Sequence, residues 1–88
     1  MNYKVSFTKS ALKALKKMDQ SNSRAILSWI KKNLEGTDNP YQQGKQLKSH
    51  LSKFWRYRVG DYRILCEINN GELIIIIVAI GHRREIYK

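Results

Sequence analysis

The apolar positions of this chain change from a period of two to a helical period and back again. Tyr3 to Phe7 alternates apolar and polar residues, which predicts a short first strand. The next apolar residues recur at i, i+3, i+4 and i+7, which predicts a helix capped at its start by Thr8 or Ser10. The buried stripe of this helix comprises Ala11, Ala14, Leu15 and Met18.

A second helix is predicted from about Ser23 to Leu34, after a break at 19–23 that is rich in turn and capping residues. Because the break is short, the two helices should form an antiparallel hairpin. Gly36 follows as a stop signal, and the segment 37–53, with Pro40 and Gly44, is predicted to be a loop. The buried positions of the second helix are Ile26, Leu27, Ile30 and Leu34.

Three strands are predicted after this loop, at 55–59, 62–68 and 73–80. Gly60-Asp61 and Asn70-Gly71 each have the composition of a two-residue hairpin turn. The first turn pairs Arg58 with Arg63. The second pairs Ile64 with Ile77, Cys66 with Ile75 and Ile68 with Leu73.

The predicted fold class is α+β, within a single domain spanning 1–88. It comprises an N-terminal strand, a two-helix hairpin and a three-stranded antiparallel sheet. The helices pack on one sheet face, and a basic concave face lies on the other.

Arginines define this basic face. Side chains alternate along a strand, so Tyr57 should face the helices while Arg56, Arg58 and Arg63 point outward. Like charges placed directly opposite one another destabilise an antiparallel pair. The opposed Arg58 and Arg63 therefore suit an anion, and the planar guanidinium matches phosphate well.

Composition points to the same kind of partner. The 88 residues carry 17 Lys and Arg against seven Asp and Glu, a net charge of +10. This excess favours nucleic acid first and an acidic protein second. The single cysteine, Cys66, excludes an internal disulfide and fits the reducing cytoplasm, and no zinc-type spacing occurs, so neither metal nor cofactor is predicted. No apolar run approaches the roughly 20 residues that span a membrane, so a soluble protein is expected.

Two segments carry a family resemblance: Trp-Arg-Tyr-Arg-Val-Gly-Asp-Tyr-Arg at 55–63 and Gly-His-Arg-Arg-Glu-Ile-Tyr at 81–87. With Gly-Lys-Gln-Leu at 44–47, they resemble RelE-family toxins of the RelE/ParE superfamily, found in bacterial type II toxin–antitoxin pairs. The resemblance implies a metal-independent, ribosome-dependent endoribonuclease. It would cleave mRNA in the ribosomal A site, beside 16S rRNA, by attack of a 2′-hydroxyl on the adjacent phosphate. It also implies an acidic, RelB-like antitoxin that blocks or distorts the site.

The resemblance carries over a set of site residues. The catalytic candidates are Arg58, Arg63, His82, Arg83 and Tyr87, and the RNA-binding candidates are Lys45, Lys48, Arg56 and Arg84.

This chain departs from the best-known RelE pattern, which has lysines at the positions of Arg56 and Arg58. Arginine stays protonated at physiological pH, so Arg58 is a poor general base. Histidine is the residue type best suited to proton transfer near neutral pH, so His82 is a candidate base, and Glu67 and Glu85 are further proton acceptors. The identity of the base stays open among these three.

Two other functions compete with the endoribonuclease: a ParE-like toxin that inhibits gyrase, and an RNA-binding protein without catalysis. ParE-like chains generally lack the full set of site arginines together with the terminal tyrosine. The sequence therefore favours the enzyme.

Overall fold

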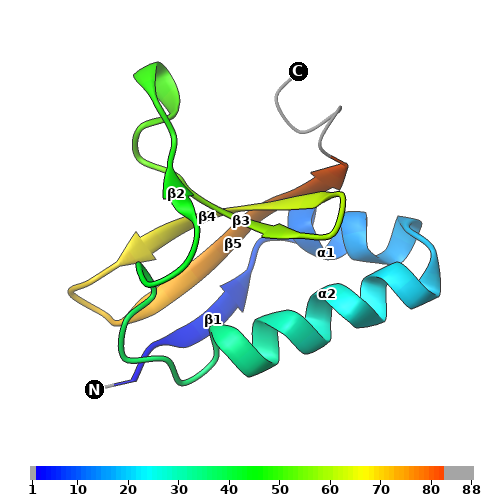
Figure 1. Ribbon diagram of the computed structural model, residues 1–88, viewed down its shortest axis with the longest axis horizontal. Helices are drawn as coiled ribbons and strands as arrows, with labels where there is room; N and C mark the ends of the chain where they lie inside the picture. The colour runs from blue at the N-terminus through cyan, green and yellow to red at the C-terminus, as the bar shows by residue number, and fades with distance from the viewer. Residues whose placement is uncertain (1, 83–88) are drawn as a thin grey trace.

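The computed structural model of the protein describes residues 2–82 and consists of a five-stranded sheet with two helices on one face (Figure 1). The spatial order of the strands is β1-β5-β4-β3-β2; β1 runs parallel to β5, and all other neighbours are antiparallel. The strands are β1 (Lys4–Phe7), β2 (Lys45–Gln46), β3 (Trp55–Val59), β4 (Tyr62–Asn69) and β5 (Ile74–His82). The α+β class is confirmed, with one strand more than the sequence predicted.

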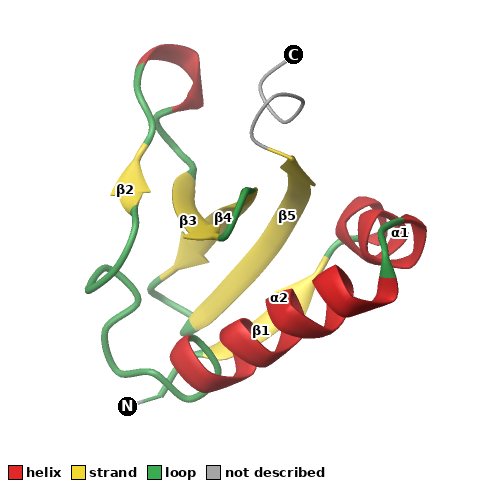
Figure 2. Cartoon of the chain, turned by 45° about the vertical axis from the view of Figure 1, so that its right-hand side comes forward, coloured by secondary structure: helices red, strands yellow, loops and turns green. Residues whose placement is uncertain are grey.

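The two helices are α1 (Lys9–Lys17) and α2 (Gln20–Asn33). As predicted, Thr8 caps α1: its Oγ1 accepts a hydrogen bond from the Ala11 amide at 3.1 Å. The second helix begins three residues before Ser23 because Asp19 already serves as its N-cap. The chain reverses direction between α1 and α2 in Figure 1, and Figure 2 shows α1 nearly end-on and α2 from the side, so the two helices form a hairpin whose axes cross at an angle.

One hydrophobic core fills the space between the helices and the sheet. Its buried members on the sheet include Tyr57, Ile64, Cys66, Ile75 and Ile77, and on the helical side Ala11, Leu15, Ile26, Ile30 and, at the C-cap of α2, Leu34. The prediction that Leu27 is buried is wrong: its side chain is 41% exposed. The core stripe of α2 follows the i, i+4 spacing of Ile26, Ile30 and Leu34, and Leu27 lies one position around the helix from it.

The predicted register between β4 and β5 is also wrong. Ile64 pairs with Ile80 and Cys66 with Ile77, because the connection has four residues, 70–73, instead of two. The side chain of Asn69 accepts a hydrogen bond from the Glu72 amide at 2.9 Å, and Leu73 adopts φ 57°. At Cys66 the register differs from the predicted one by two residues, so the partner is Ile77 in place of Ile75. Because side chains alternate with period two, this shift keeps both members of the pair on the core face.

A second irregularity lies between Leu65 and Cys66, where β5 contains one extra residue, Val78. The carbonyl oxygen of Val78 accepts a hydrogen bond from Thr8 Oγ1 at 2.9 Å. The same hydroxyl that caps α1 therefore satisfies the backbone at the bulge. Because of this extra residue, the register at Ile64 differs from the predicted one by three residues, whereas at Cys66 it differs by two.

The segment 37–53 is more ordered than predicted. It contains β2, which pairs with β3, and a 3₁₀ turn at Ser49–Leu51, which projects from the sheet in Figure 1. Side chains of β3 anchor the segment: the Tyr57 hydroxyl donates to the Pro40 carbonyl at 2.6 Å, and Trp55 Nε1 donates to the Gln43 carbonyl at 2.7 Å. Between these anchors and β2, Gly44 adopts φ 84°, and a Cβ there would collide with the Arg56 carbonyl oxygen.

Candidate functional site

The sheet face opposite the helices carries two like-charged pairs side by side. Arg58 lies directly opposite Arg63, as the sequence predicted, and Lys45 lies directly opposite Arg56. We call these four residues the basic face. The sequence does not predict the pairing of Lys45 with Arg56, because it predicts a loop over residues 37–53. On the far side of Arg63, the facing residue of β5 is Gly81, which contributes no side chain to this face.

Several guanidinium donors of the basic face are buried without a partner. The Nε of Arg56, and the Nε and Nη1 of Arg63, have no hydrogen-bond partner among the described residues. Buried N–H groups are nearly always hydrogen-bonded in folded proteins, because an unpaired one loses its hydration without compensation. These donors therefore favour an anionic ligand at this place.

An apolar residue lies among the charges. Leu65 is opposite Arg56 on β4 and is only 6% exposed, yet it is not part of the core cluster between the helices and the sheet. An apolar neighbour lowers the local dielectric constant, which strengthens the attraction between a guanidinium and an anion. The basic face thus combines excess positive charge with partial desolvation.

Glu67 shares the outward face but lies at its other end. It lies four positions along β4 from Arg63, about 13 Å at the usual rise per strand residue. Its carboxylate is 3.6 Å from the ammonium of Lys53. Lys48 is exposed on the projecting segment between β2 and β3.

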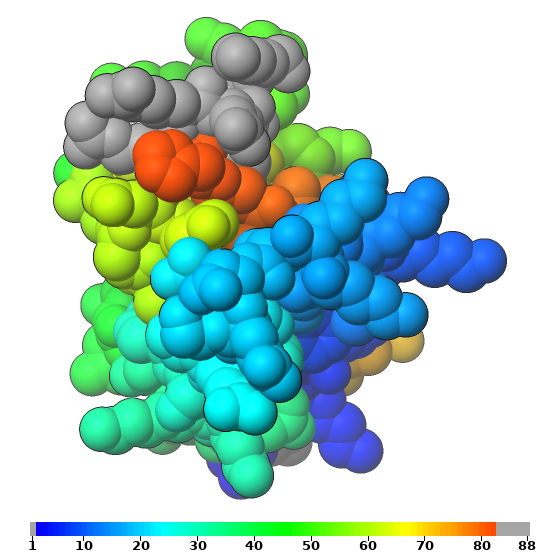
Figure 3. All heavy atoms as spheres, turned by 90° about the vertical axis from the view of Figure 1, so that its right-hand side faces the viewer, coloured from blue at the N-terminus to red at the C-terminus, as the bar shows by residue number. Residues whose placement is uncertain are grey.

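His82 lies on the other side of the sheet. It is opposite Tyr62, with ring centroids 5.8 Å apart, and lines surface hollows with Asn22 and Met18 of the helical layer. In Figure 3 the end of β5 (orange) and the β3–β4 turn (yellow-green) lie beside the helices. The strand extends two residues beyond its predicted end at Ile80, so alternation gives His82 the core-facing side.

The structure therefore brings together Lys45, Arg56, Arg58 and Arg63 and separates His82 from them. The remaining predicted site residues, Arg83, Arg84, Glu85 and Tyr87, lie outside the described residues. Within residues 2–82, no group of three potential His, Cys, Asp or Glu ligands could hold a metal ion, and no helix is both long and apolar enough to cross a membrane.

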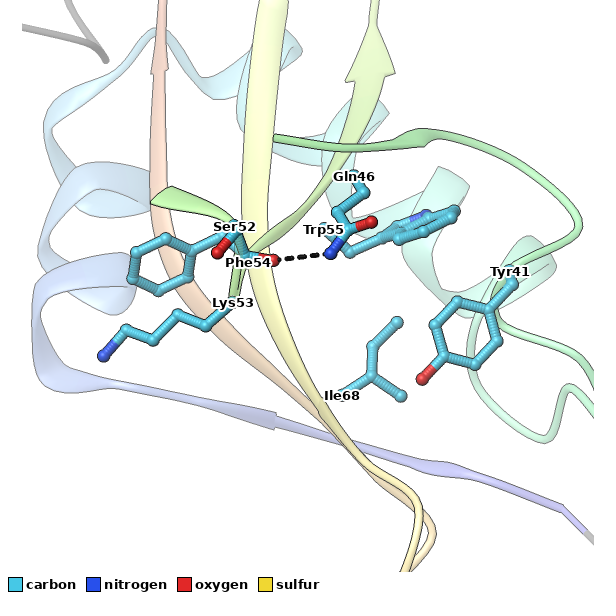
Figure 4. A pocket seen from close by; sticks show the side chains of 7 residues that line it. All are labelled: Tyr41, Gln46, Ser52, Lys53, Phe54, Trp55 and Ile68. Atoms are coloured by element: carbon cyan, nitrogen blue, oxygen red, sulfur yellow. Dashed lines mark hydrogen bonds between the residues drawn. The ribbon is translucent and has the colours of Figure 1, made fainter. Parts of the chain in front are cut away.

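A hollow of about 200 Å³ lies at the end of the sheet near the projecting segment (Figure 4). Its wall is held by a hydrogen bond from Gln46 Nε2 to the Ser52 carbonyl at 2.8 Å. Figure 4 shows Lys53 and Phe54 on one side of the strands and Trp55, Tyr41 and Ile68 on the other. Phe54 was not singled out in the sequence, although its two-residue spacing from Arg56 is the signal that places it on the outward side.

Solved structures with this arrangement of strands and helices define the class of fold. The toxin chain in the RelBE2 toxin–antitoxin complex of Mycobacterium tuberculosis has a TM-score of 0.85 and 27% identity, with 97% of this chain and 95% of that chain covered. A mutant of Escherichia coli toxin RelE in the free state has a TM-score of 0.77 at 15% identity, with 99% and 90% covered. The fold is that of RelE-like toxins.

The sequence comparison gives the family. A model described as the ParE toxin of type II toxin–antitoxin systems matches residues 5–87. Toxin RelG of Mycobacterium tuberculosis is 30% identical over 88 residues, covering 100% of this chain and 99% of its own length. Toxin RelE of the same organism is 28% identical, with 98% and 87% covered. The chain belongs to the ParE toxin family and is a type II toxin of the RelE/ParE superfamily.

Proposed function

We propose that this toxin is an endoribonuclease that cleaves mRNA in the ribosomal A site. The observation that carries this proposal is the basic face, in which Arg58 and Arg63 are opposed and buried donors of Arg56 and Arg63 lack a partner among the described residues. Converging guanidinium groups match the oxygens of a phosphodiester, which gains negative charge during reaction.

The reaction is an internal transfer at phosphorus. The ribose 2′-oxygen forms a bond to the adjacent phosphorus while the bond to the 5′-oxygen of the next nucleotide breaks. The products are a 2′,3′-cyclic phosphate and a 5′-hydroxyl, so no metal or cofactor is needed to balance the step. A proton leaves the 2′-hydroxyl and another reaches the leaving 5′-oxygen.

Arginines act here by stabilising charge. Arg58 and Arg63 hold the non-bridging oxygens as negative charge develops on them, and loss of one such donor typically lowers the rate about 10²- to 10³-fold. Lys45 and Arg56 bind flanking phosphates, and Lys48 extends this contact along the projecting segment. Since guanidinium groups remain protonated, none of these arginines removes the 2′-hydroxyl proton.

Proton transfer requires another group. His82 faces the helical layer, and Glu67 is paired with Lys53 about 13 Å along the strand from Arg63. We assign Arg83 to charge stabilisation, Arg84 to RNA binding and Tyr87 to orienting the ribose, with Glu85 as a further proton acceptor. With so weak a set of bases, the rate depends on the ribosome holding the mRNA in an in-line geometry.

The physiological inhibitor would be an acidic, RelB-like antitoxin. Several similar solved structures are toxin–antitoxin complexes, including RelBE2 of Mycobacterium tuberculosis and RelE–RelB of Pyrococcus horikoshii OT3. A net charge of +10 favours an acidic partner by long-range attraction. We place both partners and the ribosome in the cytoplasm.

The test is to incubate the purified toxin with mRNA, either free or on ribosomes with an empty A site, and to map new 5′ ends. Cuts within the A-site codon only when ribosomes are present are expected. Arg58→Ala and Arg63→Ala should each lose this cutting, whereas Lys31→Ala, at an exposed position in the last turn of α2, should keep it. Efficient cutting of free RNA would contradict the proposed dependence on the ribosome.

Gyrase inhibition is the second candidate, because the family model that matches this chain is that of ParE toxins. A supercoiling assay with purified gyrase distinguishes the two. A folded toxin that stops growth and inhibits supercoiling, but leaves A-site mRNA intact, would replace the endoribonuclease with this alternative. In that case Arg83→Ala should largely retain growth inhibition.

A further inference from the structure

An aromatic side chain extends the line of arginines on the basic face. Phe54 immediately precedes β3, so its side chain falls on the same side as Arg56 and Arg58. Figure 4 shows its ring on the opposite side of the strands from Trp55. Two backbone hydrogen bonds fix the residue: its amide donates to Leu51 O at 3.0 Å, and its carbonyl accepts from the Leu47 amide at 3.2 Å.

The ring of Phe54 is not needed to fill the core. It belongs neither to the buried cluster between helices and sheet nor to the partly buried hydrophobic residues that pack against that cluster. Phe7, by contrast, packs against the core. A half-buried phenylalanine beside arginines has the composition of surfaces that bind single-stranded nucleic acid, in which a charged groove follows the backbone and aromatic rings stack the bases.

The present neighbour of the ring can be displaced easily. Lys53 Nζ lies 5.1 Å from the centroid of Phe54 and 3.6 Å from the Glu67 carboxylate; the Lys53 side chain is 67% exposed and that of Glu67 is 44% exposed. Exposed ion pairs contribute little to stability, so the ammonium can leave the ring for a phosphate. A planar base can then take its place on the ring.

The spacing along β3 limits which base this can be. Phe54 is four residues from Arg58, about 13 Å at the usual rise per strand residue. This span is about four times the roughly 3.4 Å rise between stacked nucleotides, so the stacked base belongs to a nucleotide a few positions from the cleaved phosphodiester and not to the reacting nucleotide itself.

We propose that Phe54 stacks a base of single-stranded RNA a few nucleotides from the scissile phosphate and thereby sets the position of that phosphate against Arg58 and Arg63. Phe54 is a positioning residue, since it touches neither the 2′-oxygen nor the phosphorus. The inference rests on the proposed function, because it specifies how that same site holds its RNA.

The test measures binding in the absence of cleavage. The probe is a short RNA with 2′-O-methyl groups throughout, which blocks 2′-attack, and with 2-aminopurine at each position in turn. The full chain and its Phe54→Leu, Phe54→Trp and His50→Ala variants are compared, with thermal unfolding to confirm that each is folded. His50→Ala is the matched control, since His50 is exposed on the same projecting segment.

The expected result is quenching of 2-aminopurine at one position by the natural chain and by Phe54→Trp. Phe54→Leu should lose this quenching and bind about tenfold or more weakly, as for loss of one base stack. An abasic nucleotide at that position should weaken binding by the natural chain to the same extent, with no further loss in Phe54→Leu.

Equal binding by Phe54→Leu and the natural chain, or no effect of the abasic site, would overturn the inference. So would weaker antitoxin binding with unchanged RNA binding, which would make the ring a protein contact. Absence of measurable RNA binding by the natural chain would overturn it as well.

The proposed function is tested separately, and it fails if A-site mRNA stays intact. A chain that cuts A-site mRNA equally well with Leu at position 54 would retain the function and refute the stacking.

Discussion

Arg58 and Arg63 face one another directly across β3 and β4, on the side of the sheet away from the helices. A directly opposed pair of like charges weakens an antiparallel ladder, by up to about 1 kcal/mol relative to a neutral pair. Nothing in this geometry stabilises the fold. We therefore expect the pair to serve the proposed cleavage at a cost in stability, and substitutions of these arginines can measure the two effects separately.

Replacing Arg58 by threonine is expected to remove A-site cleavage while the free energy of unfolding stays the same or rises. Threonine is favoured in strands and removes the repulsion with Arg63. Cleavage should fall about 10²- to 10³-fold, measured by mapping of 5′ ends, and urea denaturation gives the stability. A clear loss of stability would show Arg58 to be a structural residue.

Gly44→Ala should destabilise the protein by more than Gly36→Ala. Both glycines have positive φ, 84° and 79°, so each alanine adds backbone strain of about 1 kcal/mol or more. A Cβ at 44 would also meet the Arg56 carbonyl and Trp55 Nε1, whereas one at 36 meets nothing within 4 Å. Urea denaturation of the two variants compares them, and equal losses would mean that β2 tolerates displacement from β3.

Tyr57→Phe is expected to lower the free energy of unfolding by about 1–3 kcal/mol, because the Pro40 carbonyl loses its 2.6 Å buried hydrogen bond. The ring itself, which packs against Trp29, is retained. The variant should also loosen the segment that leads to Lys45, detectable as faster amide hydrogen exchange at 41–46. Unchanged exchange there would show that Trp55 and Gln43 alone hold the segment.

The buried thiol of Cys66 should make the free energy of unfolding decrease as the pH rises in the alkaline range. Burial raises the pKa of its thiol above the ordinary value of about 8.5. Above that value the unfolded thiol ionises while the native thiol stays protonated, so the free energy of unfolding should fall as pH rises. Cys66→Ala should remove this part of the fall between pH 8.5 and 10, measured by urea denaturation at each pH. An identical pH dependence in both proteins would contradict the raised pKa.

The same burial should make the Cys66 thiol unreactive. Only the thiolate attacks a disulfide reagent, and a buried thiol with a raised pKa supplies little of it. Reaction with a coloured disulfide reagent should be slow in the native protein and rapid in denaturant. Fast reaction of the native protein would indicate opening of β4 and β5.

Local sequence predicted those parts of the fold that local chemistry controls. Gly60, at φ 59°, makes the turn that sets the Arg58–Arg63 register, and Thr8 caps its helix within three residues. The β4–β5 register depends on contacts distant in sequence, such as that of Thr8 with Val78, which no local pattern contains. Asn70-Gly71 matches a two-residue turn, but the Asn69 side chain instead holds a four-residue connection.

The candidate site was predictable to a similar degree. Alternation along β3 and β4 correctly placed Arg56, Arg58 and Arg63 on one face. The pairing of Lys45 with Arg56 was not predictable, because a strand of two residues leaves no periodicity to detect. The face on which His82 lies depends on the continuation of β5 past Ile80. The sequence did not predict this continuation, because Gly81 follows Ile80 directly.

The neighbour relationship of β1 and β5 has a consequence for synthesis. Among the described strands, β1 is paired only with β5, and its Lys4 pairs with Ile74, 70 residues later in the chain. Such long-range pairing makes folding slow, because the chain must close a large loop before the contact forms. The nascent chain therefore cannot complete the described sheet until β5 has emerged from the ribosome.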